Sequence, residues 1–379
     1  MEEKSWADLP DHIIVSVLSY LRLPQRSHVS LVCKSWHEAF CSPFLWHSFR
    51  FTFTASEDFK YQRCLDKLGQ YFRRVEVCCD QAEDKNRQNA CRAIEALAKL
   101  KKRRVEHISI RFIGENPLFY AGKEFIRSLK TLFGPVPEGT EAILGLKSVD
   151  LRKLSIAFED DLFHCLVENN FKILEELNIQ NASLVCKVTS GCILKLVQKC
   201  RKLICLATHY GSITEDILLA FTEDERSALQ NLSILCRREE KYGLDISSKT
   251  WTVLKNKLPG LKVNLAFDSS CPMFKVNAIL KPEIPVSDLR LEVQARLVCQ
   301  VYFAAEHYSG TLETLSLSTT NSPELENALI HLVTACTYLR QLYVFQCYIS
   351  QNAKTEILKR RPELKRYLLK TRETDTFFP

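Results

Sequence analysis

Cysteine and histidine are the side chains whose numbers in this sequence could support nucleophilic or metal chemistry. The chain of 379 residues contains 16 cysteines and nine histidines. A thiolate beside an imidazole is a nucleophile, and four closely spaced Cys or His side chains hold structural zinc. The cysteines are irregularly spaced, however, and no pair of C-x-x-C units occurs. We therefore predict no catalytic residue, no metal site and no cofactor, and we expect most cysteines to be small buried hydrophobes.

Sequence motifs of the common enzyme classes are also missing. The chain has no GxxxxGK[ST], no GxGxxG after a strand, no GxSxG and no HExxH. The acidic run Glu159-Asp160-Asp161 is typical of a solvated helix start. The basic run from Lys99 to Arg104 is typical of the solvated end of a helix, where cations are favoured. We therefore do not expect an enzyme.

The composition is that of a folded soluble protein, with 46% hydrophobic and 26% charged residues. Lys and Arg exceed Asp and Glu by 52 − 45 = 7, a mild excess that does not require nucleic acid as a partner. No apolar run reaches the ~18 residues of a membrane helix, and the first residues lack the regions of a signal peptide. We expect no nucleic-acid or membrane partner, and a cytoplasmic location with the nucleus as the alternative.

The elements that position functional side chains divide the chain into two parts, and the first is a short helical segment. Asp8 to Asp11 combine a capping carboxylate with a first-turn proline. The apolar residues from Ile13 to Leu21 then recur on one helical face. Arg22 to Arg26 are predicted to break this helix, and a second helical run extends from Val29 to Phe40. So small a unit with so much apolar surface is expected to be covered by the rest of the chain or by another protein.

This segment resembles the F-box family. The family pattern of Leu-Pro, an aliphatic helix, Val-Cys-Lys/Arg-x-Trp and Leu-Trp is matched by Leu9-Pro10, Ile13 to Leu21, Leu31 to Trp36 and Leu45-Trp46. The resemblance implies a three-helix F-box over residues 4–50 that docks on the Skp adaptor, and through it on cullin and RING subunits. The alternative is an ordinary three-helix cap on the downstream domain.

The residues that match the F-box pattern are our predicted adaptor contacts. They are Leu9, Pro10, Ile13, Ile14, Leu18, Leu21, Leu31, Val32, Trp36 and Trp46. Some of them must instead hold the F-box together or join it to the following domain. For Trp36 and Trp46, a structural role within the segment is as well supported by the pattern as contact with the adaptor.

The remainder of the chain, residues 51–379, repeats a Leu-x-x-Leu-x-Leu element in which other aliphatic residues replace leucine. The middle residues of the copies are Val149, Leu177, Leu206, Leu232, Leu315, Leu342 and Tyr367. Neighbouring copies are 25 to 29 residues apart, as in 177 − 149 = 28, except where weaker copies at 261–265 and 289–293 intervene. This interval is that of leucine-rich repeats, in which each copy supplies a strand and a covering helix.

Helical patterns and cysteines follow the same repeat. Ile193 to Val197 and Leu325 to Val333 are predicted covering helices. Cys200, Cys336 and Cys347 resemble the cysteines of one leucine-rich-repeat subclass, which implies that they pack inward. The predicted fold class is α/β: an N-terminal three-helix F-box followed by a leucine-rich-repeat solenoid, a curved parallel sheet with outer helices.

The combination resembles the F-box/leucine-rich-repeat family, and segments 114–122, 303–308 and 361–366 resemble one vertebrate member in the corresponding order. The resemblance implies a substrate-recognition subunit of an SCF-type ubiquitin ligase, which presents an unknown protein substrate for ubiquitination and degradation while partner subunits perform the chemistry. One alternative is a scaffold that holds the Skp adaptor without an active cullin ligase. Another is a repeat-type inhibitor or nucleic-acid binder.

Strand residues that alternate with the inward leucines are the candidate substrate contacts, because they face the other side of the sheet. They are His107, Ser109, Arg111, Asp150, Arg152, Asn178, Gln180, His209, Tyr343 and Phe345. Tyr343 and Phe345 are preferred because aromatic side chains are favoured anchors, and the alternative is packing under the C-terminal residues 374–379. Arg111 and Arg152 would suit a phosphorylated substrate.

Overall fold

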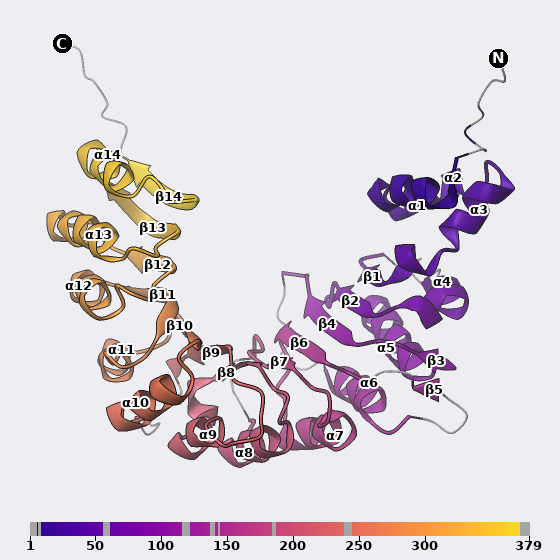
Figure 1. The fold of residues 1–379 in the computed structure, drawn as a ribbon, viewed down its shortest axis with the longest axis horizontal. Coiled ribbons are helices and arrows are strands. Elements are labelled where there is room, and N and C mark those ends of the chain that lie inside the picture. The colour runs from indigo at the N-terminus through magenta and orange to yellow at the C-terminus, as the bar shows by residue number, and fades with distance from the viewer. Residues whose placement is uncertain are drawn as a thin grey trace, which may run out of the picture. The chain divides into compact units, whose positions relative to one another are not determined.

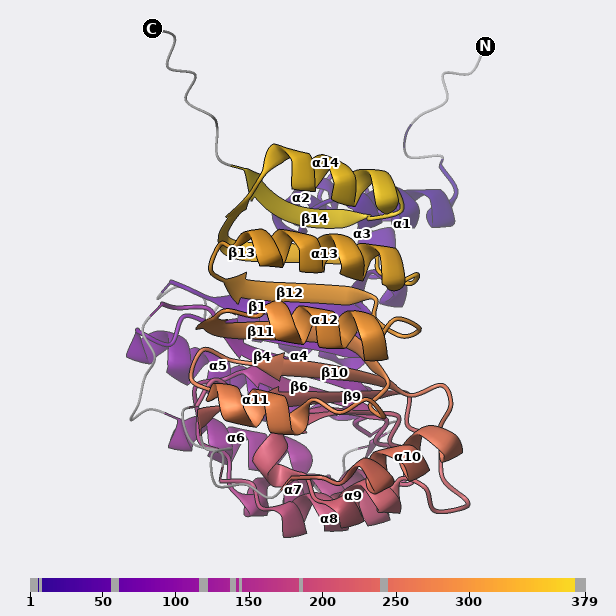
Figure 2. The same cartoon turned by 90° about the vertical axis from the view of Figure 1, so that its left-hand side faces the viewer.

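The computed structural model of the chain describes residue 6 and residues 9–55, 61–115, 122–136, 141–142, 145–183, 187–238 and 245–371. These residues form two compact units. Unit 1 comprises Met1–Ile156, His164–Ile173 and Asn181–Ser183, and unit 2 comprises Ala157–Phe163, Leu174–Gln180 and Leu184–Pro379. In each unit, parallel strands form one layer and helices cover one of its faces (Figures 1 and 2).

The N-terminal helices open unit 1. They are α1 (Asp11–Tyr20), α2 (Leu23–Val29), α3 (Lys34–Phe40) and the 3₁₀ turn η2 (Pro43–Trp46). Three helices are present, as predicted, and the first one ends at Tyr20, just before the predicted break at Arg22 to Arg26. The prediction missed α2, which begins inside that break, and the predicted helical run from Val29 to Phe40 is interrupted at residues 30–33. Pro24 lies in the first turn, where no backbone donor is needed. The backbone N–H of Arg22 donates to Gln25 Oε1 at 3.0 Å and completes the helix start.

The sheet of unit 1 has the strand order β1-β2-β4-β6, with every pair parallel. Its strands are β1 (Ser48–Phe53), β2 (Arg74–Cys79), β4 (His107–Phe112) and β6 (Ser148–Lys153). The other elements are α4 (Tyr61–Leu68), η4 (Gly69–Tyr71), α5 (Asp84–Ala98), α6 (Lys123–Phe133) and the short pair β3 (Lys102–Arg103) and β5 (Glu141–Ala142). Residue 50, our predicted domain boundary, lies within β1, a strand that the repeat pattern did not include.

The sheet of unit 2 follows the chain order from β7 to β14. Its strands are β7 (Glu176–Asn178), β8 (Cys205–His209), β9 (Asn231–Cys236), β10 (Lys262–Phe267), β11 (Val286–Ala295), β12 (Thr314–Thr319), β13 (Gln341–Ile349) and β14 (Arg366–Thr371). Its helices are α8 (Ser190–Lys199), η5 (Tyr210–Ser212), α9 (Glu215–Ala220), α10 (Ser248–Lys257), α11 (Met273–Ile279), α12 (Val298–His307), α13 (Pro323–Ala335) and α14 (Gln351–Arg360). Helix α7 (Asp160–Asn170) supplies residues to both units.

The repeat leucines form the core, as the periodicity predicted. Leu206 pairs in register with Leu177 and Leu232, and Leu315 pairs with Leu289 and Leu342. All of these side chains are buried, and each burial contributes roughly 1.5–3 kcal/mol. The predicted solenoid of parallel strands and covering helices is therefore confirmed.

Most described cysteines behave as small apolar side chains, as expected. Nine of the fifteen described cysteines are buried, among them Cys200, Cys336 and Cys347. Burial raises the pKa of the Cys200 and Cys336 thiols to about 12, because a thiolate would lose its hydration. These thiols are therefore protonated and unreactive at neutral pH.

Two arginine side chains, the buried Arg103 and the half-buried Arg361, close helix ends. Arg103 donates to the carbonyl of Leu132 at 3.1 Å, and Arg361 donates to that of Cys336 at 2.7 Å. Each guanidinium satisfies carbonyls that the last helical turn leaves without a partner. The Lys99 to Arg104 run is thus not wholly a solvated helix end, because Arg103 is buried and burial lowers its pKa.

Candidate functional site

An apolar docking surface covers the N-terminal helices. Seven of the sixteen large hydrophobic side chains that the described residues expose lie between Trp6 and Phe44. We define this docking surface as Trp6, Ile13, Val17, Tyr20, Leu31, Val32 and Phe44. On α1, Ile13, Val17 and Tyr20 recur at i, i+4 and i+7 and therefore form one exposed stripe. Such a concentration of exposed apolar side chains marks an interaction surface.

The predicted adaptor contacts fall into two groups. Pro10, Ile13, Leu31 and Val32 are exposed, the last two at 79% and 71%, and Leu9 and Leu21 are half-buried. Ile14, Leu18, Trp36 and Trp46 are buried, so they cannot offer a docking surface and instead hold the segment together. For Trp36 and Trp46, the structural alternative therefore applies. Trp6, Val17, Tyr20 and Phe44 were missed, although the helical spacing from Ile13 indicated Val17 and Tyr20.

An aromatic joint connects the N-terminal helices to the sheet of unit 1. Trp46 is 1% exposed, and its indole N–H donates to the carbonyl of Phe40 at 2.6 Å. Its ring centroid lies 5.0 Å from that of Phe40 and 6.0 Å from that of Phe49 in β1. Phe49 in turn stacks on Phe72 at 4.8 Å. We call these four residues the aromatic joint, and they make the docking helices and the first strands one packed body.

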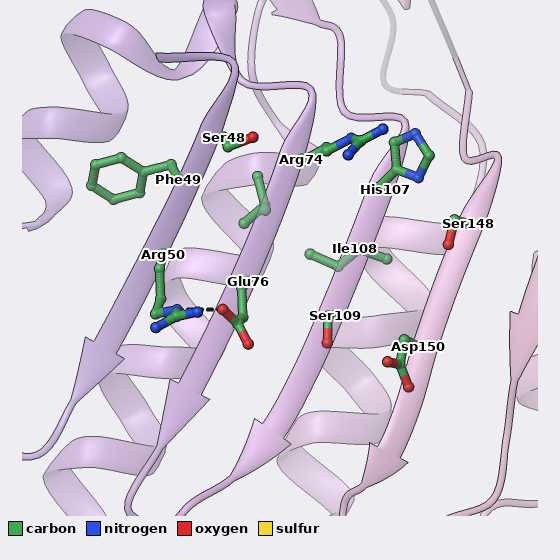
Figure 3. Close-up of a pocket in the computed structure, with 11 residues that line it drawn as sticks. Ser48, Phe49, Arg50, Arg74, Glu76, His107, Ile108, Ser109, Ser148 and Asp150 are labelled. Atoms are coloured by element: carbon green, nitrogen blue, oxygen red, sulfur yellow. Dashed lines mark hydrogen bonds and ion pairs between the residues drawn. The ribbon is translucent and has the colours of Figure 1, made fainter. Parts of the chain in front are cut away.

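A hollow of about 460 Å³ lies on the strand face of unit 1, opposite its helices, and both polar and apolar residues line it (Figure 3). Parallel register places the first residues of the four strands in one row: Ser48, Arg74, His107 and Ser148. The third residues form a second row: Arg50, Glu76, Ser109 and Asp150. The candidate substrate residues His107, Ser109 and Asp150 are thus brought together, whereas Arg50 and Arg74 were missed.

The two carboxylates of this strand face are already paired. Glu76 forms ion pairs with Arg50 and Arg111 from the strands on either side. Asp150 binds Arg152, whose Nη2 lies 2.7 Å from its Oδ2, and this hydrogen bond raises the pKa of Arg152. The two arginines that we considered for a phosphorylated substrate, Arg111 and Arg152, are therefore both engaged.

The candidate residues of unit 2 are more varied. Gln180 donates to the carbonyls of Thr208 and Ser233, at 3.0 Å each, so its amide has a structural role. Asn178 Oδ1 accepts the Gln180 backbone N–H at 3.1 Å, another local contact. His209 was predicted to face outward, but it is only 2% exposed. Burial first, and then the charge of Arg237, lowers its pKa to about 4, and a neutral buried ring does not serve as a surface contact.

Tyr343 and Phe345 keep their predicted outward orientation on β13. Phe345 is 43% exposed and Tyr343 is half-buried. Their rings lie nearly parallel, 6.2 Å apart, and the Tyr343 hydroxyl lies 3.0 Å from Gln341 Oε1, to which it donates. Residues 374–379, the alternative cover for this pair, lie outside the described residues.

The described ranges also bear on the predictions for metal ligands, for the acidic run at 159–161 and for membrane spans. They bring no three His, Cys, Asp or Glu side chains together as a metal site. Asp160 and Asp161 begin α7, as predicted, and Asp160 also accepts the Thr189 backbone N–H at 2.8 Å. No helix within the described ranges has the length and apolar character to cross a membrane.

The fold defines a class of architecture: an N-terminal F-box segment followed by a leucine-rich-repeat solenoid. Residues 6–52 match the F-box-like family model, which confirms the resemblance noted in the sequence.

Known proteins share this organisation along their length. The chain is 28% identical over 379 residues to human F-box/LRR-repeat protein 8, covering 98% of this chain and 97% of that protein. Its mouse counterpart is 26% identical over 364 residues, covering 96% and 95%. Sheep F-box/LRR-repeat protein 21 is 24% identical over 377 residues, covering 93% and 80%. A solved leucine-rich-repeat protein of Leptospira interrogans aligns over 87% of this chain and 97% of its own, at 12% identity and a TM-score of 0.25, too low to inform the fold.

Proposed function

We propose that this chain is a substrate-recognition subunit of an SCF-type ubiquitin ligase. The docking surface binds the Skp adaptor, and through it the cullin and RING subunits. The repeats present a protein substrate for ubiquitination and degradation in the cytoplasm. The chain is then an adaptor and not an enzyme, because it raises the concentration of substrate lysines near a catalytic centre in its partners.

The observation that carries this proposal is the density of exposed apolar side chains on the segment that matches the F-box. Leu31 and Val32 follow one another in the turn between α2 and α3, and both are largely exposed. Burying two such side chains against a partner contributes several kcal/mol, roughly 1.5–3 for each. If the helices were only a cap on the downstream repeats, we would expect Leu31 and Val32 to pack against those repeats. An exposed leucine adds no stability to the domain that carries it.

Co-purification with the Skp adaptor tests the proposal. We expect the wild-type chain to bind the adaptor and the double variant Leu31→Asp/Val32→Asp to lose at least a hundredfold in affinity, because two charges would be buried without partners. The matched control is Phe274→Asp in α11, which also replaces an exposed apolar side chain but lies in unit 2.

The measurements are affinity by calorimetry and the urea midpoint of each variant. Unchanged urea midpoints with selective loss in the double variant support docking through this surface. No adaptor binding by the wild type would remove the proposal and leave a repeat protein with a helical cap. Binding to the adaptor without assembly of a cullin complex able to ubiquitinate bound substrate would favour the scaffold alternative.

A further inference from the structure

The hollow of unit 1 contains one cation that no described residue neutralises. Arg74 begins β2 and is exposed, and its guanidinium makes no ion pair or hydrogen bond with any residue that the structure describes. Figure 3 shows it extending from β2 toward His107 on β4, its register partner. The first row of the hollow, Ser48, Arg74, His107 and Ser148, thus carries hydrogen-bond donors and no carboxylate.

The charge of the surrounding face has the same sign. Four arginines, Arg50, Arg74, Arg111 and Arg152, face two carboxylates, Glu76 and Asp150, which leaves 4 − 2 = +2. Arg152 is neutralised by Asp150, and the group of Arg50, Arg111 and Glu76 keeps one positive charge, so the other positive charge is that of Arg74 in the first row. A cation would be repelled there, whereas an anion would receive charge-assisted hydrogen bonds.

The dimensions indicate an extended ligand. Four strands about 4.8 Å apart make a row of roughly 14 Å, the length of about four residues of extended peptide. The hollow is open along this row and lies on the face that the helices leave uncovered (Figure 3). A single small anion would leave most of the row unused.

We propose that this row binds an anionic, extended peptide segment of the protein substrate, with the anionic group on Arg74 and His107 and the serine hydroxyls at its flanks. The proposal deepens the proposed function and rests on it for the identity of the ligand as a substrate. The shared chemistry is a peptide-borne oxyanion, either a phosphate or a carboxylate. Arg74 is the anchor, because it is the arginine of this face without a partner among the described residues.

Fluorescence anisotropy with the full-length chain tests the row. The probes are labelled eight-residue peptides of alanine and glycine that carry one central phosphoserine, two central glutamates or two central lysines. We expect the anionic peptides to bind and the lysine peptide not to bind. Binding of the phosphoserine peptide alone assigns the row to phosphate, and equal binding of the glutamate peptide assigns it to oxyanions in general.

Arg74→Gln is the central variant, and Arg92→Gln is its matched control. Both remove one exposed arginine of unit 1, but Arg92 lies on α5, on the helical side of the sheet. We expect Arg74→Gln to weaken the anionic peptides about tenfold, the usual effect of losing a hydrogen bond between charged groups, and Arg92→Gln to leave them unchanged. The double variant Ser48→Ala/Ser148→Ala should weaken them about threefold at an unchanged urea midpoint.

Three results would overturn the inference: no anionic peptide bound by the wild type at 1 mM, equal binding by Arg74→Gln, or equal losses in Arg74→Gln and Arg92→Gln. Adaptor binding is measured in the same preparations. If the chain binds the anionic peptides but not the adaptor, the proposed anion row stands and the ligase proposal is wrong. If the chain binds the adaptor but not the peptides, the ligase proposal stands and the proposed anion row is wrong.

Discussion

The docking surface and the hollow belong to the same unit but differ in the side chains that they present. The docking surface exposes aliphatic and aromatic residues on short helices, and Tyr20 is 87% exposed. The hollow presents arginine, histidine and serine on four strands held in register. Apolar area gives affinity without directional contacts, whereas charged hydrogen bonds need defined geometry.

This difference teaches how one chain can serve two partners. The helices can tolerate small shifts of a partner, because hydrophobic contact is nearly non-directional. The strands cannot shift singly, since each is held by the hydrogen bonds of its neighbours. Constant attachment therefore suits the helical segment, and discrimination among ligands suits the sheet.

The largest expected effect would show whether the two surfaces are independent. Trp46→Ala removes the centre of the aromatic joint, so we expect a loss of about 3–5 kcal/mol in the free energy of unfolding of unit 1. Because both surfaces depend on this packing, adaptor and anionic-peptide binding should be lost at the same urea concentration. Urea titrations that follow both activities provide the measurement. Loss of one activity well before the other would show that the joint does not couple the surfaces.

A second prediction sharpens the contrast between the strand faces of the two units. His107 is half-exposed in the hollow, whereas His209 is buried with its pKa lowered from 6.5 to about 4, by burial first and then by the charge of Arg237. Below pH 6.5 the His209 ring is protonated in the unfolded chain but stays neutral in the folded protein. The free energy of unfolding therefore falls as the pH falls toward 4. Between pH 7 and pH 5 this loss is about 2 kcal/mol for the wild type.

The variant His209→Gln should lack this part of the acid sensitivity. Urea unfolding of both proteins at pH 7 and pH 5 measures it, and the variant should lose about 2 kcal/mol less than the wild type. An identical decline in the two proteins would mean that His209 is protonated in the folded state. The same substitution at His107 should change peptide binding instead.

The smallest expected effect concerns the carboxylate at the centre of the hollow. Glu76→Gln releases Arg50 and Arg111 and removes one negative charge, so the anionic peptides should bind about threefold more tightly, a modest gain because exposed charges are screened by salt. Asp288→Asn is the matched control, because Asp288 pairs with Arg290 on the strand face of unit 2. Anisotropy at low salt gives both affinities, and weaker binding by Glu76→Gln would show that Glu76 itself contacts the ligand.

The fold was largely predictable from the sequence because the repeat has a short period and a strong apolar pattern. Val263 and Leu289 belong to copies in which the pattern is weak, yet both lie in strands that pair in register with the clear copies. The strand β1 was not predicted, since its alternating residues Phe49, Phe51 and Phe53 are aromatic and directly follow the F-box pattern.

The polar sites were less predictable, because they depend on register between strands that are far apart in the sequence. Arg111 was predicted and Arg74 was missed, but the structure pairs Arg111 with Glu76, and the register places Arg74 in a row without a carboxylate. The prediction that His209 is a surface contact was wrong for a related reason. Alternation predicts which side of a strand a residue faces, but not whether neighbouring side chains cover it.

The aromatic joint also has a geometric consequence. The docking helices meet β1 through packed rings, and η2 ends at Trp46, two residues before β1 begins, which leaves no span that could act as a hinge. In the proposed complex, the hollow would therefore be held at a fixed distance from the adaptor. Which lysines of a bound substrate are modified would then be decided by the length of substrate chain between its anchor and each lysine.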